Sequence, residues 1–294
     1  MARPAVDRLI SSQGWLEPVG EFEQRLVGDA YGALGDFGRT LKNMAHGTWP
    51  LQHPLHPAVV AIPLGAWTVG VLADYAALVS GAVPTRVGDF ALIIGLLGAV
   101  VSAWSGLTDH HETYGQERRV ATLHGLVMTL AVAFFLVSLL LRWFAGPAGH
   151  GPAVALATIG LLVALVGGYL GGHLVYGYGT AVNHNAFTEP PRGWAAIGRP
   201  EEFREGELRS ATVGSAAVLV VRRNGRLLAI GDTCSHAGGP LHEGTLDGDE
   251  VTCPWHGSRF CLRDGSVRGG PANFPQQRYE LREVEGRVEA RAAD

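Results

Sequence analysis

The chain has 294 residues, enough for two domains, and its mean hydropathy is positive at +0.15. Only 17% of the residues are charged and the formal net charge is −4, so the overall charge gives no reason to expect a nucleic-acid partner. Three cysteines are too few for a disulfide framework.

The first 55 residues are predicted to be a cytoplasmic lead-in. The opening stretch MARPAVDRLISSQGW has no continuous apolar core, so a cleaved signal peptide is not expected. Residues 21–47 are expected to form one or two surface helices lying against the membrane. The pattern of residues 1–55 indicates no function.

Four long apolar runs follow, each close to the 20 residues that cross a bilayer. The predicted spans are Ala58–Val79, Val87–Leu107, His124–Leu141 and Ala153–Tyr176. Charged or Gly/Pro-containing breaks separate them, as helix ends require. A helical soluble core is the alternative, but four nearly uncharged runs in succession favour a four-helix transmembrane domain over residues 56–180.

The charges beside the spans predict the orientation in the cell membrane. An even number of spans puts both termini on one side, and six basic residues lie near the spans on that side: Arg39, Lys42, Arg118, Arg119, Arg192 and Arg199. The opposite side has Arg86 and Arg142. The positive-inside rule then predicts a multi-pass protein, in contact with membrane lipid, with both termini in the cytoplasm.

Several histidines stand near the ends of the predicted spans: His56, His110, His124 and His173. Ionisable groups in a membrane are candidate functional sites. Paired imidazoles from neighbouring helices could bind haem b, and a histidine with Asp109 could bind a quinone. Alternatively, the histidines simply face headgroups or cap helix ends. Asp74, deeper in the first span, is expected to pair with an unidentified polar group of the bundle.

After a linker at 181–192 the hydrophobic period changes to that of strands. AAVLVVRRNGRLLAI contains two β-rich runs around Asn224-Gly225, a strong hairpin signal, and Asp-Gly turns recur in LDGDEVTCPW and LRDGSVRGG. Residues 193–294 are therefore predicted to be a small antiparallel all-β domain.

This domain contains two pairs of metal-ligand residues. Cys234 and His236 are followed, after sixteen intervening residues, by Cys253 and His256. Two thiolates and two imidazoles satisfy a Cys2His2 zinc site. They equally satisfy a Rieske [2Fe–2S] cluster, in which two cysteines bind one iron and two histidines the other.

The stretches CSHAGGPL at 234–241 and CPWHGSRF at 253–260 resemble the two cluster-binding loops of the Rieske family, and GGPA at 269–272 resembles its proline-containing covering loop. The resemblance implies one [2Fe–2S] cluster, with Cys234 and Cys253 on the buried iron and His236 and His256 on the outer one. Such a site moves one electron, and its histidines can couple the electron to a proton.

The chain departs from the high-potential members of that family. Gly239 and Trp255 stand where those members have a pair of disulfide-forming cysteines, and Phe260 replaces a tyrosine. Ser258 could still donate a hydrogen bond to a cluster sulfur. Fewer hydrogen bonds to the sulfurs leave the reduced cluster less stable, so a low potential is expected, as in ferredoxins of oxygenase systems.

The membrane half resembles a family of four-helix membrane domains, domain of unknown function 2231, in LHPAVVAIPLGAW at 55–67, SGLTDH at 105–110 and GGHLVYGYG at 171–179. The predicted architecture is an α-helical transmembrane bundle of four spans followed by a small all-β Rieske domain. The predicted function is one-electron transfer between unknown redox donor and acceptor proteins, with no catalytic residue identified. The alternatives are a small membrane oxidoreductase that couples the cluster to haem or quinone, and a redox sensor.

Overall fold

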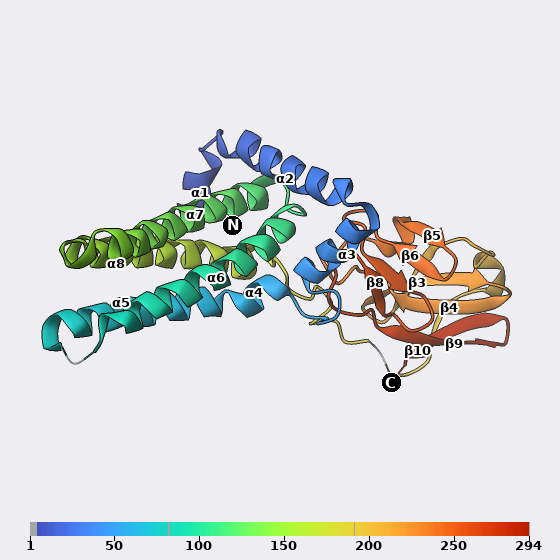
Figure 1. Cartoon of the computed structure of the whole chain (residues 1–294). Coiled ribbons are helices and arrows are strands. Elements are labelled where there is room, and N and C mark those ends of the chain that lie inside the picture. The colour runs from blue at the N-terminus through green and yellow to red at the C-terminus, as the bar shows by residue number, and fades with distance from the viewer. Residues whose placement is uncertain (1–4, 82, 191, 294) are drawn as a thin grey trace. The chain divides into compact units, whose positions relative to one another are not determined.

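The computed structural model describes residues 5–81, 83–190 and 192–293 (Figure 1). The chain forms two compact units. The first contains the residues up to Leu41 together with Leu55–Tyr178, and the second contains Lys42–Pro54 together with the chain from Gly179 onward. The segment just before the first span therefore groups with the C-terminal domain.

Three helices precede the spans: α1 (Ala5–Ser11), α2 (Leu16–Ala33) and α3 (Gly35–His46). Of the one or two helices expected within residues 21–47 the structure has two, α2, which begins earlier at Leu16, and α3. In α2, Phe22 and Leu26 are exposed on one side of the helix, whereas Glu17 on another side pairs with α7.

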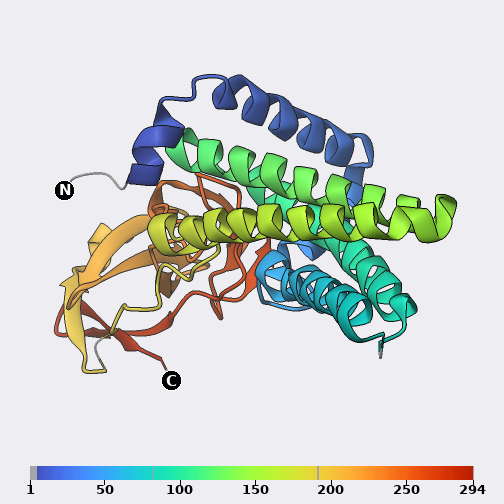
Figure 2. The ribbon, with the colours of Figure 1, turned by 90° about the vertical axis from the view of Figure 1, so that its left-hand side faces the viewer.

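Among the described residues, four helical stretches are long and apolar enough to cross a membrane: Leu55–Ser80, Thr85–His110, Gly115–Phe144 and Gly149–Tyr178. They correspond to α4 (Leu55–Val59) with α5 (Ala61–Ser80), α6 (Thr85–His110), α7 (Gly115–Phe144), and α8 (Gly146–His173) with the π-helical turn η1 (Leu174–Tyr178). Figures 1 and 2 show α5 beside α6 and α7 beside α8. The four predicted spans are confirmed as helices.

The third helix differs from the prediction at its start, because α7 begins at Gly115 rather than at His124. Its polar first turns are compensated by α2. Arg119 Nε donates to Glu17 Oε2 at 2.7 Å, and Arg118 donates to both Glu17 and Glu21. Because these charges are paired, the helix continues through a stretch that the sequence indicated as a break.

Asp74 has a partner that the sequence did not reveal. Arg142 Nη1 donates to Asp74 Oδ1 at 2.8 Å and to Asp89 Oδ1 at 3.1 Å, and the side chains of Asp74 and Arg142 are 0% and 2% exposed. About two helical turns away along the same helices, Trp67 stacks on Phe135 in the apolar core of the bundle, with ring centroids 4.3 Å apart. Arg142 is therefore a buried ion-pair partner and does not belong among the interfacial charges.

The C-terminal domain is antiparallel and β-rich, as predicted, and its strands form two sheets. The six-stranded sheet has the order β1-β10-β9-β4-β3-β2, and the four-stranded sheet has the order β5-β6-β7-β8. The strands are β1 (Ala195–Gly198), β2 (Arg209–Val213), β3 (Ala216–Arg223), β4 (Arg226–Gly231), β5 (Thr245–Asp247), β6 (Glu250–Thr252), β7 (Arg259–Cys261), β8 (Val267–Gly269), β9 (Arg278–Val284) and β10 (Arg287–Ala292).

The turns of these sheets follow the sequence signals. Asn224 and Gly225 connect β3 to β4 with φ values of 49° and 74°, the left-handed conformation of the tightest hairpins. Leu219, Ile230, Leu241 and Phe260 are fully buried in one core that also includes the sulfur-bearing side chains of the candidate site. The cysteines of the two loops are therefore packed into the hydrophobic core of the domain.

Candidate metal centre

Two loops with the same backbone pattern hold the predicted ligands. In the first loop Cys234 N donates to Gly239 O at 2.8 Å, and Gly238 N donates to Cys234 O at 2.9 Å. In the second, Cys253 N donates to Ser258 O at 2.8 Å, and Gly257 N donates to Cys253 O at 3.2 Å. The fourth residue after each cysteine has a positive φ, 81° in one loop and 71° in the other, a conformation that glycine adopts without strain.

The two cysteine side chains lie side by side in the buried part of the site. Cys234 is 1% exposed and Cys253 is 3% exposed, and their thiols are hydrogen-bonded to each other. Four backbone N–H groups, two from each loop, donate to these sulfurs: those of His236, Ala237, Trp255 and His256. Such donors favour thiolate, which is the form that binds a metal.

The pKa values of the two thiols move in opposite directions. The hydrogen bond from Cys234, with further support from backbone N–H groups, lowers the pKa of Cys253 to about 6. The pKa of Cys234 is raised by its hydrogen bond to Cys253 and by burial. Cys253 is therefore the thiol that loses its proton more readily, and a cation that binds both sulfurs must displace the proton held by Cys234.

The two histidines lie at the more exposed part of the site. The rings of His236 and His256 are half-buried, with centroids 4.9 Å apart and planes at 86°. All four predicted ligands are thus brought together from two loops. Among the residues that the structure describes, however, no three His, Cys, Asp or Glu side chains converge on one ion position. Two thiolates and two imidazoles are the donor set of a Rieske [2Fe–2S] cluster and equally that of a Cys2His2 zinc ion.

The proline-containing segment covers the second loop. Gly270 has φ 83°, and a Cβ on it would lie 2.6 Å from Gly257 O, so the two backbones are in direct contact. Ala272 N donates to Ser258 Oγ at 3.1 Å. Because Ser258 is fully buried and its oxygen accepts this bond, its own hydrogen remains available for a second hydrogen bond.

Residues remote in sequence support the same loops, and sequence reasoning missed them. Thr48 Oγ1 donates to Gly270 O at 2.6 Å, and Asn43 Oδ1 accepts from Gly270 N at 3.1 Å. Asn185 Nδ2 donates to Thr233 O at 2.9 Å. Thr48 and Gly270 are 222 residues apart, and no local motif links them.

Gly239 and Trp255 occupy the positions where a disulfide would stand in high-potential relatives. A Cβ on Gly239 would lie 2.9 Å from Cys253 Sγ and 3.0 Å from the Trp255 ring. Trp255 is 50% exposed. The indole of Trp255 therefore packs against the backbone of Gly239, where a side chain would collide with the ring and with Cys253 Sγ.

The predicted membrane histidines separate into two groups. His56 and His124 lie together, with ring centroids 6.2 Å apart. His110 instead contacts Thr113 and Thr122, and His173 Nε2 lies 2.8 Å from Asp7 Oδ1.

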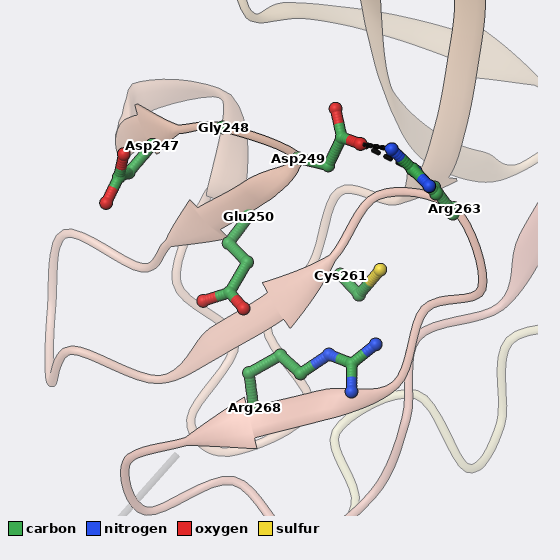
Figure 3. A pocket seen from close by; sticks show the side chains of 7 residues that line it. All are labelled: Asp247, Gly248, Asp249, Glu250, Cys261, Arg263 and Arg268. Carbon is green, nitrogen blue, oxygen red and sulfur yellow. Dashed lines mark hydrogen bonds and ion pairs between the residues drawn. The ribbon is translucent and has the colours of Figure 1, made fainter.

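A separate surface pocket of about 520 Å³ lies around β5, β6, β7 and β8 (Figure 3). It is lined by Asp247, Gly248, Asp249, Glu250, Cys261, Arg263 and Arg268. Its opposite charges are partly paired, with Arg263 Nε donating to Asp249 Oδ2 at 2.6 Å. None of the four predicted ligands lines it, so it is not the metal centre.

Two families match the chain. Residues 193–280 match the Rieske [2Fe-2S] domain, and residues 52–184 match a family described as a predicted membrane protein, DUF2231. Ferredoxin CarAc of Metapseudomonas resinovorans is 34% identical over 96 residues, which are 32% of this chain and 90% of that ferredoxin.

Two other relatives resemble the same part of the chain. The ferredoxin component of biphenyl 2,3-dioxygenase from Rhodococcus jostii (strain RHA1) is 36% identical over 81 residues, 28% of this chain and 76% of that protein. Apoptosis-inducing factor 3 of Homo sapiens is 31% identical over 99 residues, 34% of this chain, and the matched region is only 16% of that relative. The chain therefore belongs to the Rieske [2Fe-2S] domain family through residues 193–280, and joins that domain to a DUF2231 domain at 52–184.

Proposed function

We propose that this chain is a multi-pass membrane protein whose C-terminal domain passes single electrons between redox partner proteins. Its four apolar helices supply the anchor, and the DUF2231 match supports that placement. The ferredoxin relatives, one of them named as a dioxygenase component, support a carrier that works with a separate oxidoreductase. The domain boundaries at 56–180, 181–192 and 193–294 are part of this proposal.

Cys234 and Cys253 are the proposed ligands of the inner iron, and His236 and His256 those of the outer iron. The observation that carries the assignment is the convergence of two buried thiols and two half-buried imidazoles from loops of identical backbone pattern. The bound cluster supplies a one-electron centre. The loops hold the thiolates with backbone N–H groups, and the histidine N–H groups can release or take up a proton as the iron charge changes.

The potential of this centre is proposed to lie toward the low end of the Rieske range. Ser258 carries the only hydroxyl of the second loop, residues 253–260, because Phe260 has none. Gly239 and Trp255 replace the disulfide-forming pair. Electrostatic stabilisation of the reduced cluster is correspondingly small.

The cytoplasm is the proposed location of both termini and of the Rieske domain. With Arg142 buried against Asp74, the interfacial charges on the opposite side reduce to Arg86, which strengthens the charge bias. The absence of disulfide-forming cysteines in the two loops agrees with a reducing compartment.

The test is low-temperature electron paramagnetic resonance of the dithionite-reduced, detergent-purified full chain. A Rieske-type signal is expected, and it should disappear in Cys234→Ser and His236→Ala. Cys261→Ser and His242→Ala are matched controls outside the proposed ligand set and should retain it. A colourless protein carrying only zinc, or a signal that survives His236→Ala, would overturn the assignment.

A further inference from the structure

His56 is held in a particular way by the second span. Its Nδ1 lies 2.9 Å from Ser102 O of α6. One helical turn later stands Gly106, where a Cβ would lie 2.8 Å from the imidazole ring. The edge of the His56 ring therefore contacts α6 at two points four residues apart, the carbonyl of Ser102 and the backbone of Gly106.

His124 is held in the same way by the fourth span. Its Nδ1 lies 2.8 Å from Gly167 O of α8, and a Cβ on Gly171, four residues later, would lie 3.2 Å from the ring. Each histidine is therefore contacted by a carbonyl and a glycine of the next span, at a sequence separation of 46 residues for His56 and Ser102 and 43 for His124 and Gly167. The arrangement repeats across the two helix pairs.

These hydrogen bonds fix the protonation of both rings. A backbone carbonyl can only accept, so Nδ1 carries the hydrogen and Nε2 of a neutral ring keeps its lone pair. No hydrogen bond to Nε2 of His56 or His124 occurs among the residues that the structure describes. An Nδ1–H bonded to a carbonyl is the usual support of a metal-ligating histidine. A quinone carbonyl would instead need a hydrogen-bond donor.

The separation of the rings suits one metal ion between them. Two metal–nitrogen bonds of about 2.0–2.1 Å, with about 1.1 Å from each nitrogen to its ring centre, give centroids roughly 6.3 Å apart. The observed distance is 6.2 Å, with the ring planes at 86°. No third protein ligand converges on a common ion position within the described part of the chain. A porphyrin supplies the four remaining ligands of a six-coordinate iron.

We propose that His56 and His124 are the axial ligands of one haem inside the helix bundle. The inference rests on the proposed membrane placement and gives the chain a second one-electron carrier, whose iron alternates between iron(III) and iron(II). The other two membrane histidines are excluded by their contacts. Both ring nitrogens of His110 face Thr or Glu oxygens, and His173 Nε2 faces Asp7.

The test uses the full chain, purified in detergent from cells supplied with iron and a haem precursor. The wild type should contain about one haem per chain and show a Soret band that shifts on reduction, with a low-spin signal of the oxidised iron. His56→Ala and His124→Ala should each reduce the haem content to less than about a tenth, or convert the iron to high spin. His150→Ala and His173→Ala should leave both readouts unchanged.

His124→Gln distinguishes the loss of a haem ligand from a general failure of the variant to fold. Its amide can still donate to Gly167 O, but it cannot ligate iron, so it should lose the low-spin signal while the Rieske signal of the same sample remains. A wild type without haem but with the Rieske signal would overturn this inference and leave the proposed function intact. Haem that survives His56→Ala and His124→Ala but is lost in His110→Ala would also overturn it.

Discussion

Ala272 donates its backbone N–H to the hydroxyl oxygen of Ser258 at 3.1 Å, so the covering loop determines which way that hydroxyl points. The serine is fully buried and belongs to the loop that carries Cys253, whose N–H donates to Ser258 O. Its hydrogen is therefore directed away from Ala272. A single side chain thus connects the covering loop to the electrostatics of the proposed cluster.

Ser258→Ala is expected to lower the reduction potential of the cluster. A hydrogen bond to a sulfur stabilises the reduced, more negative state, and about 1–2 kcal/mol of such stabilisation corresponds to roughly 40–90 mV for one electron. A redox titration followed by the Rieske signal measures the shift. Ser266→Ala, in the turn between β7 and β8, should leave the potential unchanged, and an equal shift in that control would contradict the role given to Ser258.

Gly239→Ala is expected to reduce the amount of cluster bound. The new methyl group would lie 2.9 Å from Cys253 Sγ and 3.0 Å from the Trp255 ring, and the sulfur cannot move without leaving its position in the site. The iron content of the purified protein measures the loss. Gly193→Ala, which places a methyl group in open space, should bind as much iron as the wild type.

Thr48→Val is expected to make the cluster more labile. Thr48 Oγ1 lies 2.6 Å from Gly270 O and 3.1 Å from Ala272 O, and a valine of similar shape removes the donor to the covering loop. Leaving a buried carbonyl without its partner costs about 1–3 kcal/mol. The rate at which visible absorbance fades with an iron chelator should rise several-fold. Thr40→Val, on an exposed part of α3, is the matched control, and equal rates in both variants would argue against a role for residues 42–54.

The metal ligands and the hairpin turn could be predicted from the sequence, because each is encoded by a short local pattern. The four ligands stand in two short motifs whose glycines and backbone bonds form the loops, and Asn224-Gly225 is itself the hairpin turn. Thr48 could not be identified in this way, because its partner is 222 residues away and is a backbone carbonyl, which leaves no trace in composition. The start of α7 was predicted too late because the partner of Arg119 is Glu17, in a segment with no assigned role.

The partner of Asp74 could not be predicted from the sequence either, because Arg142 is 68 residues away. Asp74→Ala is expected to destabilise the bundle by about 3–5 kcal/mol, because it leaves the Arg142 guanidinium buried with Asp89 alone. Thermal unfolding of the detergent-purified chain, followed by helical circular dichroism, measures the change. Asp89→Ala should cost less stability, since Asp89 is 28% exposed and Asp74 remains in place.

The double variant Asp74→Leu/Arg142→Met removes both charges and should recover most of the lost stability, since apolar side chains of similar volume can replace a buried ion pair. If that double variant unfolded as readily as Asp74→Ala, a lost packing contact and not an uncompensated charge would explain the effect.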